Sequence, residues 1–143
     1  MRAYFFVNSW LSGIQKGLQT AHCVAEMADD AETPNARTNL YREWAKVHKT
    51  IIVLEGGPHA GLVELVEFFG RQFNLPWASF SEDEESLNGA MTCVGIIVPE
   101  DLYERAKMVR EGDLNIDQEE LRDPKDIWEA EFIDILNSCS LAS

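Results

Sequence analysis

The chain has 143 residues, enough for one domain that buries roughly two thirds of its unfolded surface. Hydrophobic residues make up 45% and charged residues 26%, a composition that excludes collagen-like, mucin-like and wholly disordered proteins. The net charge is −13, and nearly all of it comes from residues 77–143, which carry 17 acidic and 5 basic side chains. Because an acidic surface repels polyanions, general nucleic-acid binding is disfavoured.

The sequence favours a cytoplasmic protein without a membrane partner. No apolar run approaches the roughly 18 residues that a membrane span needs, and residues 1–10 lack the small-residue cleavage site of a secretory signal. The cysteines at 23, 93 and 139 have no CxxC spacing, which argues against a disulfide framework or a zinc site. We therefore expect reduced thiols, no bound metal and no cofactor.

The first half of the chain predicts two strands and three helices. Residues 3–8 are aromatic and β-branched, which indicates a buried strand. Residues 14–29 are expected to form a helix, and a second, shorter helix is expected to end near His48. Residues 49–55 include four consecutive large apolar side chains, which favours an inner strand buried on both faces, and a third helix follows the turn at 56–58. The face of the first helix that meets the core is expected to consist of Ile14, Leu18, Ala21, Ala25 and Ala28.

The second half predicts two more strands and two more helices. Residues 75–80 and 90–99 are expected to be strands, joined by the acidic loop 81–89. A helix is expected between Pro99 and Gly112, and the last helix spans 126–137. This order of elements predicts a layered α/β fold, with a mixed sheet of about four strands flanked by helices.

We divide the chain into an α/β domain of residues 1–110 and an acidic C-terminal extension of residues 111–143 that contains the last helix. The apolar stripe of that helix, Trp128, Phe132 and Ile135, suits packing on the domain and equally suits contact with a second subunit. A homo-oligomer therefore stays open as an alternative.

Several segments are distinctive in both sequence and order. GIQKGLQTAH (13–22) lies on the first helix, WAKVHKTIIVL (44–54) enters the second strand, and LPWASF (75–80) precedes NGAMTCVGIIVP (88–99). Together they resemble the type II peptidyl-tRNA hydrolase family, over about residues 3–110. The resemblance implies that family's fold. In the family a Gln-x-x-His pattern follows a glycine- and lysine-rich loop, and the glutamine and histidine of residues 13–22, Gln19 and His22, match it.

The chain also departs from the family pattern. In the register that matches Gln19, the family's functional lysine falls on Gln15, and Lys16 stands one place along. The family's Asp-Ala-Gly-x-Thr-Gln segment corresponds to SEDEESLN, which keeps acids such as Glu82 and Asp83 but neither the glycine nor the Thr-Gln pair. Four consecutive acids do not suit an enzyme that positions an anionic tRNA. The resemblance thus implies a retained scaffold with altered chemistry. Short phage-encoded relatives look similar in this way, so a viral origin is a matter of resemblance alone.

A polar crevice is expected where the first strand ends, the usual place for a ligand in α/β sheets. Ordinary explanations stay open, because polar residues are common in loops, paired glycines are common in tight turns, and a histidine is often buried and satisfied by a carbonyl. A lysine near a helix start suits a phosphate or carboxylate. The candidate ligand-binding residues are Asn8, Ser9, Ser12, Gln15, Lys16, Gln19, His22, Gly56, Gly57 and His59.

Three functions are weighed. The first is a non-catalytic protein that holds or sequesters a small anionic or nucleotide-like molecule; under the resemblance this would be a viral sponge for a host defence signal. The alternative is a peptidyl-tRNA hydrolase that cleaves the ester between peptide and tRNA, with Lys16, Gln19 and His22 as catalytic residues and an acid of residues 82–85 in place of the family aspartate. The third is a protein-interaction module that works through the acidic face.

Overall fold

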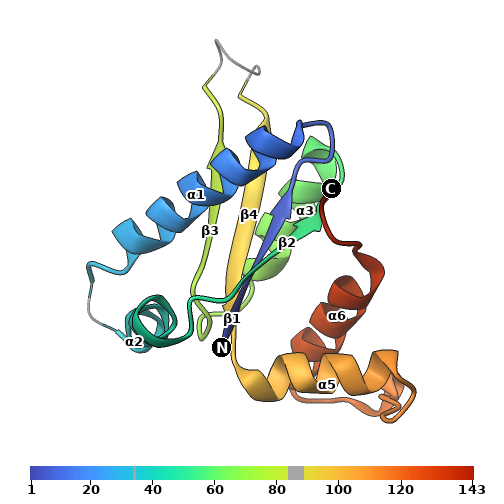
Figure 1. Ribbon diagram of the computed structural model, residues 1–143. Coiled ribbons are helices and arrows are strands. Elements are labelled where there is room, and N and C mark those ends of the chain that lie inside the picture. Colours follow the sequence, from blue (N-terminus) through green and yellow to red (C-terminus); the bar gives the residue numbers. More distant parts are fainter. Residues whose placement is uncertain (34, 84–88) are drawn as a thin grey trace.

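The computed structural model describes residues 1–33, 35–83 and 89–143. Within these ranges four strands form one mixed sheet in the order β2-β1-β4-β3 (Figure 1). Strand β1 (Arg2–Val7) pairs in parallel with β2 (Ile51–Glu55) and antiparallel with β4 (Met91–Val98), which in turn pairs antiparallel with β3 (Trp77–Ser81). The predicted α/β class and the mixed sheet of four strands are confirmed.

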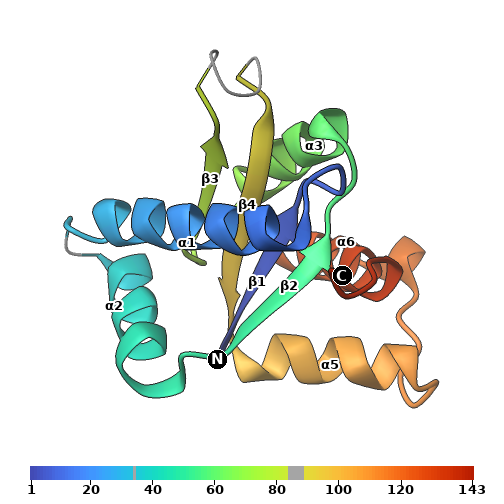
Figure 2. The same cartoon turned by 45° about the horizontal axis from the view of Figure 1, so that its top comes forward.

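Helices cover both faces of this sheet. Figure 2 shows α1 (Gly13–Asp30) lying across the strands, and α2 (Ala36–Glu43) continues into a π-helical turn, Trp44–His48. On the opposite side, α3 (His59–Phe69) and α6 (Pro124–Ser138) lie together. The described part of the chain also contains α5 (Glu100–Arg110) and a short 3₁₀ turn, Gln118–Glu120.

The alternation of side chains along β1 creates two apolar layers. Phe6 points into the larger layer with α3, α5 and α6, whereas Phe5 points into the smaller layer beneath α1. Both side chains are fully buried, as expected for an inner strand flanked by helices on both faces. The predicted strand at residues 3–8 is therefore confirmed, with bounds one residue earlier at each end.

The prediction for the buried face of α1 is wrong. Ile14 and Leu18 are 81% and 55% exposed, and the alanines expected beside them are exposed as well. The helix is turned the other way because the polar side chains that it buries find partners at the end of the sheet, which removes the usual penalty for burying them. The buried residues of α1 are Lys16, Gln19, Thr20, Cys23 and Met27.

The expectation of an inner strand at residues 49–55 is also wrong, because β2 lies at an edge of the sheet. Its side chains are apolar in succession because helices cover both faces of this edge strand. Val53 packs against the smaller layer, and Leu54 belongs to the larger one. The outer edge meets a segment from the end of the chain. Ala142 donates its N–H to the Val53 carbonyl at 2.9 Å, and Leu141 forms a bridge with Leu54.

Helix α6 packs on its own domain. The Trp128 ring stacks on Phe68 and Phe132 at centroid distances of 4.8 and 5.3 Å, and its indole N–H donates to the Phe68 carbonyl at 2.9 Å. Both Trp128 and Phe132 are buried in the larger layer. The stripe of the last helix therefore belongs to the core of this chain, while the boundary proposed at residue 110 stays a prediction. None of the helices in the described part of the chain combines the length and apolar character that a membrane span requires.

Substitutions at Gly95 and Gly17 test how closely α1 packs on the sheet. A Cβ on Gly95 of β4 would lie 2.5 Å from the Phe5 ring and 2.9 Å from the Met27 methyl, whereas a Cβ on Gly17 of α1 meets nothing within 4 Å. We expect Gly95→Ala to lower the free energy of unfolding by about 1–3 kcal/mol. Gly17→Ala, the matched control, is expected to raise it by up to about 1 kcal/mol, since a helical glycine is destabilising. Urea titrations with unchanged slopes measure both, and equal effects of the two variants would contradict the packing described.

Candidate functional site

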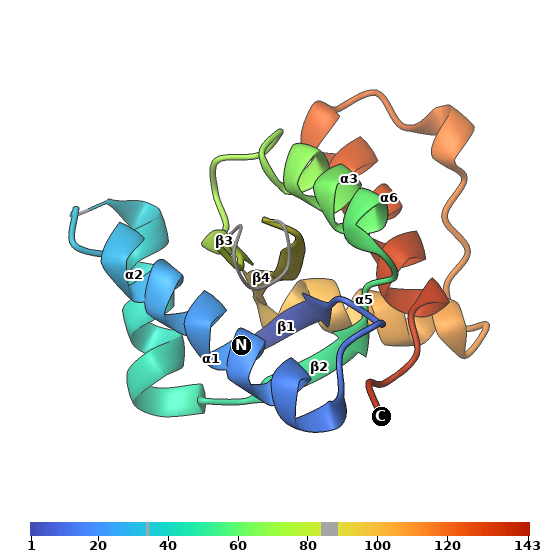
Figure 3. The same ribbon diagram turned by 90° about the horizontal axis from the view of Figure 1, so that it is seen from above.

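The residues predicted to bind a ligand lie around the point where the parallel strands β1 and β2 end, the end of the sheet that Figure 3 views from above. Helix α1 begins there with a capping box. Ser12 Oγ accepts the Gln15 N–H at 3.3 Å, and Gln15 Oε1 accepts the Ser12 N–H at 3.2 Å. This reciprocal cap fixes the start of the helix. It holds Gln15 on the exposed side and turns Lys16, the next residue, into the protein.

Lys16 forms a largely buried ion pair with Glu55, the last residue of β2. Lys16 Nζ lies 2.7 Å from Glu55 Oε1, and the exposed fractions of the two side chains are 8% and 22%. The end of the chain closes over the pair: Lys16 also donates to the Ser143 carbonyl at 3.3 Å, and Ser143 N–H donates to Glu55 Oε1 at 3.2 Å. Glu55 Oε2 is shielded from solvent and has no hydrogen-bond partner among the described residues.

The surroundings of Glu55 favour its charged form. The hydrogen bond from Lys16 lowers the pKa of this carboxyl below its usual value of 4.5, and the nearby Ser9 hydroxyl lowers the pKa further, against an opposing effect of burial. Glu55 is therefore a carboxylate at neutral pH. It balances the charge of Lys16 within the ion pair.

A second acid reaches the same side of α1 from the end of β3. Gln19 Nε2 donates to Glu82 Oε1 at 2.6 Å, and the Thr92 hydroxyl on β4 donates to Gln19 Oε1 at 2.8 Å. Gln19 is only 6% exposed, so its amide is held at both ends in one orientation. We call the resulting group of side chains the α1 polar face: Lys16, Gln19, Glu55, Glu82 and Thr92.

The loops beside the α1 polar face are tied to one another. Asn8 donates its side-chain N–H to the Met91 carbonyl at 3.1 Å, and His59 Nδ1 accepts the Met91 N–H at 2.9 Å. Ser9 Oγ accepts the Gly57 N–H at 3.0 Å. These predicted binding residues therefore do structural work in this state, and they hold the loops after β1 and β2 against the start of β4.

Gly56 and Gly57 have the geometry of a tight turn, the simpler of the two explanations for this glycine pair. Gly56 N–H donates to the Val7 carbonyl at 2.8 Å, and Gly57 donates to Ser9, so neither amide is directed to an anion. Gly57 has a φ of +80°, and a Cβ on Gly56 would lie 2.5 Å from a Leu62 methyl. Both positions need glycine for the tight strand-to-helix turn.

Gln19 and His22 match the same family motif but lie in different surroundings. Gln19 is buried in the α1 polar face, whereas His22 is exposed and stacks on the Phe80 ring at a centroid distance of 4.5 Å. Lys16 and His22 are six positions apart, so they leave the helix in different directions. Ser12 and Gln15, also among the predicted binding residues, serve the helix cap.

Two members of the α1 polar face, Glu55 and Thr92, were not predicted from the sequence. Glu55 ends a run of apolar strand residues, and a single acid in that position signals a carboxylate held near the core. Thr92 lies within a continuous apolar strand, where a hydroxyl is a weaker sign of a polar contact near the core. Of the acids 82–85, Glu82 contacts the site, while Glu84 and Glu85 lie outside the described residues.

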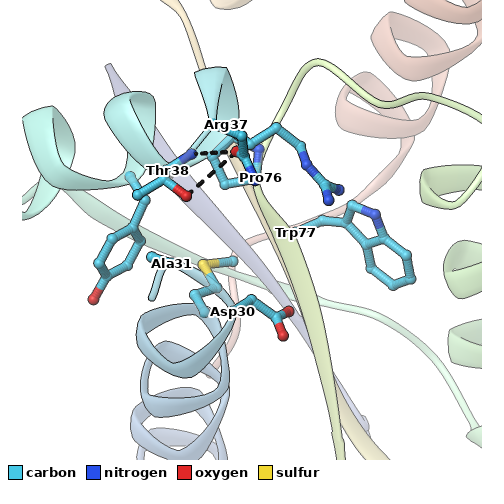
Figure 4. A pocket seen from close by; sticks show the side chains of 9 residues that line it. Asp30, Ala31, Arg37, Thr38, Pro76 and Trp77 are labelled. Carbon is cyan, nitrogen blue, oxygen red and sulfur yellow. Dashed lines mark hydrogen bonds between the residues drawn. The ribbon is translucent and has the colours of Figure 1, made fainter. Parts of the chain in front are cut away.

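A small cavity lies at the other end of α1, between α2 and the start of β3 (Figure 4). Its volume is about 30 Å³, and the Thr38 N–H and hydroxyl both point to Asn35 Oδ1, at 2.9 and 3.3 Å. That volume corresponds to roughly one water molecule. It is therefore too small for an organic ligand.

Comparisons with known proteins add no family assignment. A scan against protein-family models and a search of curated proteins both find no match to this chain. The geometry of the α1 polar face is therefore the guide to the function of this chain.

A double-mutant cycle tests the ion pair between Lys16 and Glu55. We expect Lys16→Met to lower the free energy of unfolding by about 1–3 kcal/mol, because it leaves a partly buried carboxylate without its cation. Adding Glu55→Leu is expected to restore part of the loss, with a coupling between the two sites of about 0.5–3 kcal/mol. Urea unfolding at pH 7 measures each variant, and additive effects would contradict the pair.

The pH dependence gives this cycle a second readout. Because the folded pKa of Glu55 is lowered, its stabilisation is present above the unfolded value of 4.5 and is lost as pH falls from there through the folded pKa. In Glu55→Gln, the fall in stability over that acidic range is expected to be shallower than in the parent. The exposed-acid variant Glu64→Gln serves as the control and should keep the parent's slope.

Proposed function

We propose that this protein binds a small anionic or nucleotide-like molecule at the α1 polar face without turning it over. The observation that carries the proposal is the orientation of α1, which buries Lys16 and Gln19 and leaves Ile14 exposed. Leaving a large aliphatic side chain in water forgoes about 1.5–3 kcal/mol of burial energy. A helix turned against its own apolar pattern, over a satisfied polar network, is typical of a functional surface.

The groups of the α1 polar face suit a ligand that carries both an anion and hydrogen-bond donors. The Lys16 ammonium, which now contacts Glu55 and the main-chain oxygen of Ser143, supplies the positive charge for a phosphate or carboxylate. Glu55 Oε2 has no hydrogen bond within the described part of the chain, so a hydroxyl or amino group that reaches it would satisfy an unpaired acceptor. Phosphate beside hydroxyl and amino donors is the chemistry of a nucleotide.

The same geometry favours binding over catalysis. The candidate general base, His22, is stacked on Phe80 outside the α1 polar face. A general base and the group it activates need to lie within hydrogen-bond reach of each other. The proposal also keeps the protein in a cytoplasm, where nucleotides are plentiful and its free cysteines stay reduced.

One observation favours the alternative, a peptidyl-tRNA hydrolase. Glu82 lies in the segment that corresponds to the family's Asp-containing segment, and it contacts Gln19 at 2.6 Å on the side of α1 that also carries Lys16. In this second proposal Lys16 stabilises the negative charge that develops on the ester, and Gln19 with Glu82 orients the attacking water.

The binding proposal predicts thermal stabilisation by nucleotides. We expect at least one member of a panel of nucleoside mono-, di- and triphosphates and cyclic dinucleotides, at millimolar concentration, to raise Tm, because a ligand that binds only the folded state stabilises it. Lys16→Ala is expected to abolish the shift, whereas Lys46→Ala, an exposed lysine on the π turn, should keep it. A flat response to the whole panel, from folded protein, would rule the proposal out.

The hydrolase alternative predicts multiple turnovers. Release of the acyl group from an N-blocked aminoacyl-tRNA is measured with substrate in large excess over protein. If the alternative holds, Gln19→Ala and Lys16→Ala each lower kcat/KM by about 10²-fold or more, as expected for groups that position water or stabilise charge. His22→Ala is expected to have a smaller effect, because that side chain lies outside the α1 polar face. Absence of turnover would eliminate this alternative and leave the binding proposal standing.

A further inference from the structure

A hollow lies at the opposite end of the sheet from the α1 polar face. Its volume is about 420 Å³, within the range of roughly 300–1,000 Å³ that is usual for small-molecule sites. Pro99, in its wall, follows Val98, which pairs with Arg2 at the amino end of β1. We call it the α5–α6 hollow because the starts of both helices line it, together with Leu40 of α2 and the loop 71–75.

The floor and one wall of the α5–α6 hollow are apolar and rigid. Leu102 and Trp128 form the floor and are 2% and 8% exposed, and the Trp128 indole is fixed by its hydrogen bond to the Phe68 carbonyl. The wall at Leu75 is held by Gln72, whose Oε1 accepts the Leu75 N–H at 2.7 Å and whose Nε2 donates to the Leu75 carbonyl at 3.2 Å. The hollow is therefore formed before any ligand arrives, which lowers the cost of binding.

The charges at the rim are unequally engaged. The two acids, Asp101 and Glu129, both pair with Arg105, and the Glu129 side chain is only 10% exposed. The two cations are held loosely. The Lys125 side chain is 71% exposed, and its ammonium lies 3.9 Å from the Glu129 carboxylate. The Arg71 side chain is 64% exposed, and its guanidinium lies 4.0 Å from the Glu131 carboxylate. A ligand anion thus finds two available cations, whereas a ligand cation would have to compete with Arg105 for each acid.

From this arrangement we propose that the α5–α6 hollow binds an amphipathic carboxylate, with an alkyl or aryl body over Leu102 and Trp128 and its carboxylate at Lys125 and Arg71. The exposed Phe73 at the rim, 78% accessible, extends the apolar surface over which such a body lies. This site is independent of the function proposed for the α1 polar face, because the two share no residue.

The test compares three ligands with the same chain: decanoate, decan-1-ol and decylamine, each titrated below its aggregation concentration and followed by calorimetry and tryptophan fluorescence. We expect decanoate to bind about three- to tenfold more tightly than decan-1-ol, the gain expected from exposed ion pairs, and decylamine to bind more weakly than either. Absence of decanoate binding, or an affinity order led by decylamine, would overturn the proposal.

Matched variants locate the site. The double variant Lys125→Gln/Arg71→Gln changes only exposed side chains and is expected to reduce decanoate affinity to that of decan-1-ol, while decan-1-ol binding stays unchanged. Lys107→Gln, an exposed lysine of α5 away from the lining, is the control for net charge and should keep decanoate binding. If Lys107→Gln weakens decanoate as much as the double variant, the attraction comes from overall charge and the proposed site is wrong.

Discussion

The ion pair between Lys16 and Glu55 joins three parts of the chain that are distant in sequence: the start of α1, the end of β2 and residue 143. An ammonium group buried on a helix has to find a carboxylate, and this requirement fixes how α1 is rotated over the sheet. With α1 in that rotation, Gln19 reaches Glu82 and Thr92, and Ile14 is left in solvent. The α1 polar face and the exposed apolar side chains of the helix are thus two results of one electrostatic constraint.

The sequence alone predicted those parts of the fold that depend on local pattern. Strand β1 and helix α5 were found close to their observed bounds, because aromatic runs and a Pro start with a Gly stop are local signals. The rotation of α1 was missed because Ile14 and Leu18 form a regular apolar stripe, and what overrides it is a contact between Lys16 and a residue 39 positions away. Periodicity carries no information about such a partner.

The structure brings together only some of the residues that the sequence predicted for the candidate site. Lys16 and Gln19 do lie together, whereas Gly56 and Gly57 serve the turn and His22 lies outside. Glu55 was missed because its role comes from the parallel pairing of β1 with β2, which brings the end of an edge strand beside the start of a helix. The acidic character of the second half likewise hides a local exception, the loosely held cations of the α5–α6 hollow.

The segment that reaches β2 near the end of the chain has a consequence for handling the protein. Residues 140–142 are hydrogen-bonded along the outer edge of β2, where Ile51 is 47% exposed. A strand edge that loses its cover is a template for another chain, and apolar β-branched residues make it a strong one. Removal of residues 140–143 would therefore uncover the edge of β2 from Val53 to Glu55 and promote aggregation.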